Sequence, residues 1–124
     1  MSSLDSLQEW IKGERLKAKN GDAVAQFNLG CCCFSGNGVT KDIVQAASWW
    51  RKAAEQGHAD AQNNLGTCYA DGIGLNRDLA QAAFWYQMAA EQGHAIAQNT
   101  LGSCYADGNG PNTGSGRSLL GSAT

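Results

Sequence analysis

Residues 57–92 read GHADAQNNLGTCYADGIGLNRDLAQAAFWYQMAAEQ, and they repeat the preceding unit without a gap. Residues 21–56 read GDAVAQFNLGCCCFSGNGVTKDIVQAASWWRKAAEQ and share 19 of 36 positions with them. Residues 93–110, GHAIAQNTLGSCYADGNG, begin the unit a third time and match its first half at 14 of 18 positions. A period of this length indicates an array of stacked helical units.

Each unit carries two helical patterns. In residues 57–70, Ala61, Leu65, Cys68 and Tyr69 fall on one face of a helix, which we call helix A. In residues 78–90, apolar positions again recur at helical spacing after a capping aspartate, and we call this second segment helix B. Glycines between the segments allow the chain to reverse. Each unit is therefore predicted to be a helical hairpin that is stable only when stacked on its neighbours.

Small and large residues recur where these helices should meet. Gly30, Gly66 and Gly102 stand in the middle of successive helices A. Because glycine inside a helix costs about 1 kcal/mol relative to alanine, we expect a close approach of backbones at these positions. The bulky residues expected to fill the gaps between hairpins are Trp49, Trp50, Trp85 and Tyr86.

This repeated pattern resembles a known family. It reads A-x-A-Q-x-x-L-G-x-x-Y-x-x-G-x-G, followed by D-x-x-x-A-x-x-W-x-x-x-A-A-x-x-G, and it is similar to the Sel1-like repeat, a relative of the tetratricopeptide repeat. The resemblance implies an all-α fold, a right-handed α-solenoid of helix-turn-helix repeats. It also implies a scaffold or adaptor for complex assembly without intrinsic catalysis. The first unit departs from the pattern, with Cys33 where Tyr69 and Tyr105 stand.

The repeat divides the chain into five expected segments. The first, before the repeats, resembles a polar helix B and is expected to cap the solenoid. The last is rich in glycine and serine and is expected to be a flexible tail. In order, the segments are a capping helix at 1–20, repeats at 21–56 and 57–92, a partial repeat of helix A alone at 93–110, and the tail at 111–124. We expect the partial repeat to leave Leu101 and Tyr105 uncovered, with self-association there as an alternative role.

Composition limits the function. With 9 lysines and arginines against 11 aspartates and glutamates, the net charge is −2, so no basic surface for nucleic acid is expected. The apolar runs are too short for a membrane span, and residues 1–10 do not form a secretory signal. We therefore expect a cytoplasmic protein without membrane insertion.

The five cysteines are spaced unlike a disulfide framework or a zinc site. Cys32, Cys68 and Cys104 lie one period apart, in successive modules, and no helix B contains a partner cysteine. Cys31, Cys32 and Cys33 are consecutive on a helix, so their side chains point about 100° apart. We expect structural cysteines and no cofactor or metal, with a reactive thiol at Cys31 or Cys33 as the alternative.

No catalytic motif is found. The G-x-G pairs recur as turns, and there is no phosphate-binding loop, nucleophile elbow or zinc-protease motif. His58 and His94 hold the position of Asp22 at the start of helix A, where a polar side chain can cap the helix. A hydrolase-like (β-lactamase-like) or thiol-linked protein is the alternative function, and only analogy within the wider family supports the hydrolase.

The remaining candidate function is binding of a protein or peptide of unknown identity. In a solenoid of this type helix A lines the concave face, so its polar positions outside the apolar stripe are expected to project into a groove. Asparagine has both a donor and an acceptor and can hold the main chain of an extended peptide. The candidate binding residues are Phe27, Asn28, Asp60, Asn63, Asn64, Thr67, Asn99 and Thr100.

Overall fold

The computed structural model describes the backbone of residues 3–106 and the side chains of residues 5–103. Within this part of the chain the structure is helical, without a strand. The helices are α1 (Ser3–Lys19), α2 (Ala23–Ser35), α3 (Ile43–Glu55), α4 (Ala59–Asp71), α5 (Leu79–Glu91) and α6 (Ala95–Ala106). The predicted array of helical hairpins is confirmed. The expected tail at 111–124 lies outside the described residues.

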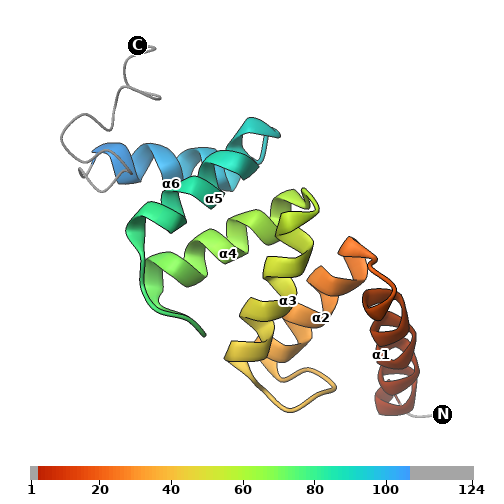
Figure 1. Ribbon diagram of the computed structural model, residues 1–124. Coiled ribbons are helices and arrows are strands. Elements are labelled where there is room, and N and C mark those ends of the chain that lie inside the picture. Colours follow the sequence, from red (N-terminus) through yellow and green to blue (C-terminus); the bar gives the residue numbers. More distant parts are fainter. Residues whose placement is uncertain (1–2, 107–124) are drawn as a thin grey trace.

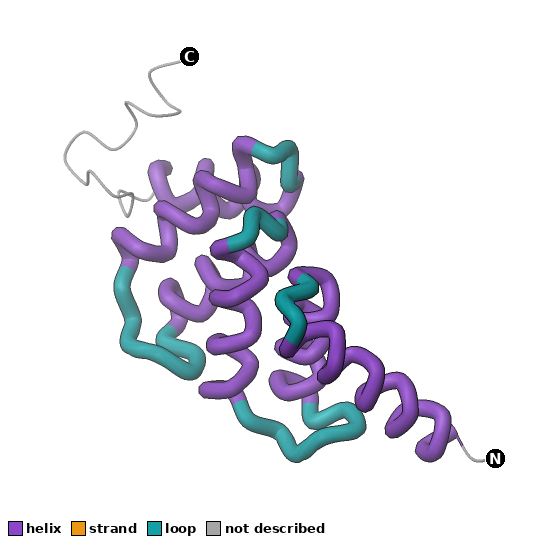
Figure 2. The backbone as a smooth tube through the Cα atoms, turned by 45° about the vertical axis from the view of Figure 1, so that its right-hand side comes forward, coloured by secondary structure: helices purple, strands orange, loops and turns teal. Residues whose placement is uncertain are grey.

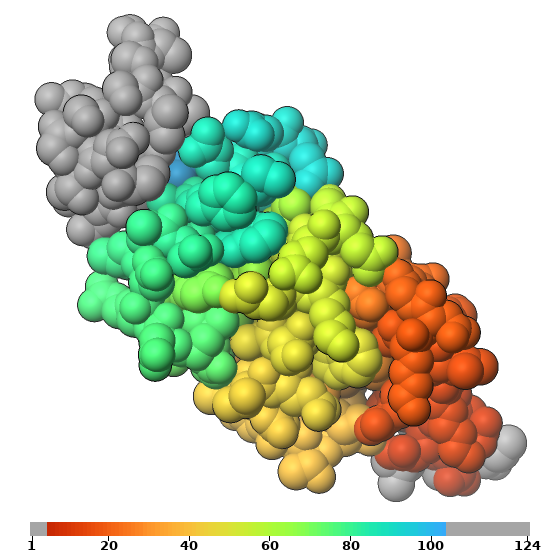
Figure 3. Space-filling model, in the orientation of Figure 1, coloured from red at the N-terminus to blue at the C-terminus, as the bar shows by residue number. Residues whose placement is uncertain are grey.

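The helices stack in chain order. Each packs mainly on the helix before it and the helix after it, and the closest pairs are α2 with α3 and α4 with α5 (Figure 1). Short turns lie along one edge of the stack and the two long loops lie along the other (Figure 2). The modules follow one another along a single direction (Figure 3). Thus α2, α4 and α6 are the helices A, and α1 takes the place of a helix B ahead of α2.

None of the described helices is long and apolar enough to cross a bilayer.

Side chains cap the helices A as the sequence predicts. Asp22 Oδ1 accepts a hydrogen bond from the Ala25 amide at 2.9 Å. At the same position, His58 Nδ1 accepts from the Ala61 amide at 3.2 Å. Both groups satisfy an amide that has no partner inside its helix.

One glutamine in α2 and one in α4 each join three helices. Gln62, which is 1% exposed, donates from Nε2 to the carbonyl of Ala54 at the end of α3. Its Oε1 accepts from Gln92 at the end of α5, at 2.8 Å. Gln26 makes the same two contacts, with the Ala18 carbonyl and with Gln56. Both the N–H and the C=O end of these buried amides are therefore hydrogen-bonded to neighbouring helices, a role that the sequence pattern did not predict.

The space beside the mid-helix glycines is filled differently from what the sequence predicts. A Cβ atom on Gly30 would lie 2.5 Å from the ring of Trp50, and one on Gly66 would lie 2.9 Å from the ring of Tyr86. Aromatic rings from helix B, and not helix backbones, therefore fill this space. At Gly102 a Cβ atom would have no neighbour within 4 Å among the described residues.

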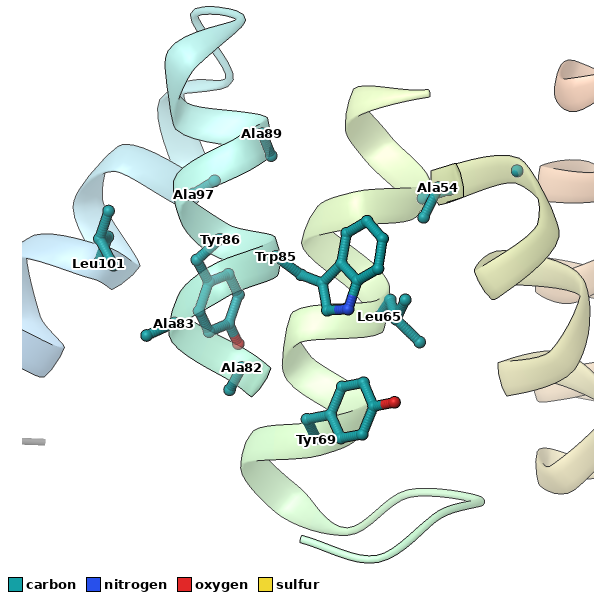
Figure 4. Close-up of a cluster of buried hydrophobic side chains, with 12 residues drawn as sticks. Ala54, Leu65, Tyr69, Ala82, Ala83, Trp85, Tyr86, Ala89, Ala97 and Leu101 are labelled. Carbon is teal, nitrogen blue, oxygen red and sulfur yellow. The ribbon is translucent and has the colours of Figure 1, made fainter. Parts of the chain in front are cut away.

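The largest buried cluster spans α3 to α6. Figure 4 shows Trp85 reaching from α5 toward Leu65 on α4, with Tyr86 and Leu101 in the same cluster. Leu101 is fully buried, so the expectation of an uncovered Leu101 is wrong: the residue packs within the core that α5 supplies. The side chain of Tyr105 lies outside the described residues.

Candidate functional site

A hollow of about 270 Å³ is lined by residues of α2, α3 and α4 and of the loop that follows α4. Phe34 forms one wall and is 40% exposed, and its ring lies 5.6 Å from that of Trp50. We call this site the Trp50 hollow. Its lining residues are Cys31, Phe34, Trp50, Asn64, Thr67, Cys68 and Ile73. The lining is mostly apolar, with an amide and a hydroxyl as its polar groups.

The two polar groups of the Trp50 hollow differ in their availability. The Thr67 hydroxyl lies 2.8 Å from the hydroxyl of Tyr86 and 3.3 Å from the carbonyl oxygen of Asn63. The half-buried Asn64 side chain makes no hydrogen bond within residues 5–103. Asn64 therefore offers both a donor and an acceptor to a molecule that enters the hollow.

Two predicted binding residues in α2 are engaged within the protein. The ring of Phe27 stacks on that of His58, with centroids 4.7 Å apart, and is half-buried. The amide of Asn28 donates to Oε1 of Glu14 at 2.8 Å. Glu14 itself is 5% exposed, so this contact fixes α1 against α2.

The other predicted residues lie outside the Trp50 hollow. Asp60 is exposed, and its Oδ1 lies 2.8 Å from Nε2 of His94. Because Nδ1 of His94 accepts from a backbone amide at 3.1 Å, the N–H group is at Nε2, which donates a hydrogen bond to the Asp60 carboxylate. Oδ1 of Asn63 is buried, without a hydrogen-bonding partner in the described part of the chain. Asn99 is exposed and Thr100 is half-buried, both on α6. The structure thus brings only Asn64 and Thr67 of the predicted set together.

The two thiols of the Trp50 hollow are held in their neutral form. Burial raises the pKa of Cys31, and the charge of Asp60 adds a smaller increase. Burial, with a smaller effect of Asp71, raises the pKa of Cys68 to about 11. Since the thiolate is the nucleophile, both groups are poorly suited to attack at neutral pH. Cys31, Cys32, Cys33 and Cys68 are all free thiols.

A second hollow of about 270 Å³ lies between α3 and the 72–78 loop. Its residues include Val44, Ser48, Arg51 and Tyr69. The guanidinium of Arg51 is already engaged by the Tyr69 hydroxyl and by Glu55 at 3.7 Å. The guanidinium of this second hollow is therefore already paired within the protein. The Asn64 amide of the Trp50 hollow, in contrast, has no hydrogen-bonding partner among the described residues. Among the described residues, no group of three or more histidine, cysteine or acidic side chains could hold a metal ion.

Several lining residues were not predicted from the sequence. Trp50 was assigned to the core alone, and Phe34 and Ile73 were given no role. One signal was available: Cys33 and Phe34 stand where the second module has Tyr69 and Ala70. This exchange moves an aromatic ring one position along helix A, from a buried place to the rim of the hollow.

Comparisons with known proteins agree with this architecture. The profile of the Sel1 repeat matches residues 23–58, 59–94 and 95–117. A Sel1 repeat protein from Oxalobacter formigenes has a solved structure that aligns with a TM-score of 0.79 and 39% identity, over 82% of this chain and 42% of that one. A protective antigen of uropathogenic Escherichia coli strains, described as displaying an SLR fold, aligns with a TM-score of 0.77 and 43% identity, over 82% of this chain and 22% of that one.

One curated relative also matches over a short stretch. The secretory immunoglobulin A-binding protein of Escherichia coli O6:H1 (strain CFT073) is 51% identical over 37 residues. The match covers 30% of this chain and 8% of that protein. This chain thus spans less than half the length of each of these three proteins.

Proposed function

Because the chain belongs to the Sel1 repeat family, we propose that it is a non-catalytic scaffold or adaptor that binds a protein or peptide partner on its helix A side. Proteins of this family generally serve as scaffolds for protein interactions. A relative named for binding secretory immunoglobulin A has a protein as its ligand, which supports the same class of ligand here.

One observation supports this surface above others. The Asn64 side chain lines an apolar hollow and has no hydrogen-bonding partner among the described residues. An amide in such a place can bind the N–H and C=O groups of a peptide main chain, while the hollow receives a side chain. Such a site binds a partner without altering it.

The thiols give no support to a thiol-linked enzyme. Burial raises the pKa of Cys31, Cys32, Cys33 and Cys68, which keeps these groups protonated at neutral pH. Reactive cysteines are instead exposed and have a lowered pKa. The free thiols accord with a reducing compartment, and we propose the cytoplasm. No specific observation favours the hydrolase alternative.

Site-specific photocrosslinking tests the surface. The change Phe34→p-benzoylphenylalanine places a crosslinker in the lining of the Trp50 hollow and leaves Asn64 in place. The change Met88→p-benzoylphenylalanine places it at an exposed position of α5, as a control. We expect discrete protein adducts in cell extract from position 34 and none of the same mass from position 88. Identical adducts from the two positions, or none from position 34, would refute binding at this surface.

A further inference from the structure

The Trp50 hollow and the carboxylates of α4 together define a more specific ligand. Resting on the proposed function, we infer that the hollow binds an extended peptide in which an apolar side chain lies two positions from a lysine or arginine. The apolar side chain enters the hollow, the main chain bonds Asn64, and the basic side chain pairs with Asp60.

The size of the Trp50 hollow favours a side chain over a whole small molecule. Its volume of about 270 Å³ lies at the lower end of the roughly 300 to 1,000 Å³ that is usual for sites of drug-sized ligands, and it is enough for one apolar side chain. Aromatic rings of Phe34 and Trp50 and the side chain of Ile73 line it. Such a lining gains free energy when it buries an aliphatic or aromatic side chain, because apolar surface is removed from water.

Charge along α4 favours a basic neighbour for that side chain. Asp60 lies near the beginning of α4 and Asp71 ends it, so the two carboxylates stand on either side of Asn64 along the helix. The Asp60 side chain keeps 61% of its surface exposed while it accepts from His94. Its charge reaches the hollow, since it adds to the effect of burial in raising the pKa of Cys31.

The spacing along the helix fixes the spacing in the ligand. Asp60 precedes Asn64 by four residues, which corresponds to a rise of about 6 Å along the helix axis. In an extended peptide, side chains two positions apart point the same way and are separated by about 6.6 Å. A peptide that runs along α4 with its apolar side chain beside Asn64 therefore brings a basic residue two positions away to Asp60.

Fluorescence polarisation with short synthetic peptides tests this ligand. The probe is fluorescein-labelled Gly-Ser-Arg-Ser-Leu-Ser-Gly, together with the same sequence in reverse order. Matched peptides carry glutamate for arginine, serine for leucine, or arginine directly beside leucine. We expect one of the two directions to bind best. The glutamate change should weaken its binding about two- to fivefold, as is usual for an exposed ion pair.

Variants of the full chain assign the contacts. Asp60→Lys should reverse the preference, so that the glutamate peptide binds more tightly than the arginine peptide. Glu9→Lys makes the same charge change on α1, at a side chain that is 72% exposed, and should leave the preference intact. Asn64→Ala should weaken every peptide about three- to tenfold through the lost hydrogen bonds. Circular dichroism verifies folding, and Asp60→Asn, which should abolish the preference, replaces the lysine variant if that variant unfolds.

The outcomes separate the two levels of the proposal. Equal binding of the arginine and glutamate peptides, or an unchanged preference in the Asp60 variants, would overturn the assignment of a basic–apolar peptide. Crosslinking from position 34 would still support a partner on this surface in that case. If no peptide binds and no crosslinked adduct forms, the proposed function is overturned as well.

Discussion

The side-chain Nε2 of Gln92 donates a hydrogen bond of 2.8 Å to the side-chain oxygen Oε1 of the buried Gln62. Gln62 in turn donates to the main-chain carbonyl of Ala54, in the last turn of α3 in the preceding module. One fully buried amide thus connects α3, α4 and α5. An unpaired buried polar group costs about 1 to 3 kcal/mol, so the pairing of both ends matters for stability.

The change Gln62→Leu keeps roughly the same volume and removes both hydrogen bonds. We expect the free energy of unfolding to fall by about 1 to 2 kcal/mol, because both hydrogen bonds of a buried amide are lost while the Ala54 carbonyl and the Gln92 amide each keep a hydrogen bond to Gly57. Urea denaturation measures this change. Gln98→Leu is the matched control: its side chain is exposed and donates only to Ala90, so a loss below about 1 kcal/mol is expected. Equal losses in the two variants would contradict the role of the buried amide.

Replacing glycine by alanine should have opposite effects at two equivalent positions. Gly66→Ala forces the new methyl group against the Tyr86 ring, and we expect a loss of about 1 to 3 kcal/mol. Gly102→Ala meets no atom within 4 Å in the described part of the chain and gains helix propensity, so we expect stabilisation by up to about 1 kcal/mol. Thermal denaturation of both variants decides the matter. A stabilised Gly66→Ala protein would show that the ring can move aside at little cost.

The period and the pattern within one module were sufficient to predict the helices. A cap at Asp22 or His58 involves atoms three residues apart, and such local contacts follow from sequence alone. The bond between Gln62 and Gln92 joins residues 30 positions apart, so it depends on how the helices stack. The same holds for the Trp50 hollow, since its walls come from different modules. Repetition shows which positions are constrained, and the stacked structure shows what constrains them.

The buried thiol of Cys68 should make stability depend on alkaline pH. Its pKa rises from an ordinary value of 9.0 to about 11 in the folded protein, mainly through burial. Between these pH values the unfolded chain has released the proton while the folded chain still holds it. The contribution is therefore complete below pH 9 and is lost as the pH rises toward 11. Denaturant midpoints measured from pH 7 to 11 should fall more steeply for the natural chain than for Cys68→Ala. Parallel curves would contradict the raised pKa.

Hydrogen exchange should distinguish α6 from α4. Helix α4 packs on both α3 and α5, whereas among the described helices α6 packs mainly on α5. Local opening is easier where fewer apolar contacts must be broken. We expect the amides of residues 97–103 to exchange faster than those of residues 61–67, as measured by mass spectrometry of peptic peptides. Equal protection of the two segments in a monomeric sample would contradict this expectation.

The glutamine contact across the module boundary has a consequence for building longer arrays. The acceptor that Gln62 uses in the preceding module is the main-chain carbonyl of Ala54, a group that any amino acid at that position supplies. This hydrogen bond therefore sets no requirement on the side chain at position 54, whereas the packing of the junction does, since Ala53 and Ala54 are buried in the core cluster that includes Leu65. A copy of residues 57–92 inserted after residue 92 would meet the equivalent carbonyl, that of Ala90. The copy would also supply an equivalent glutamine to bond it. The modules can in this sense replace one another, because the same hydrogen bond joins each pair while the outward-facing residues remain free to vary.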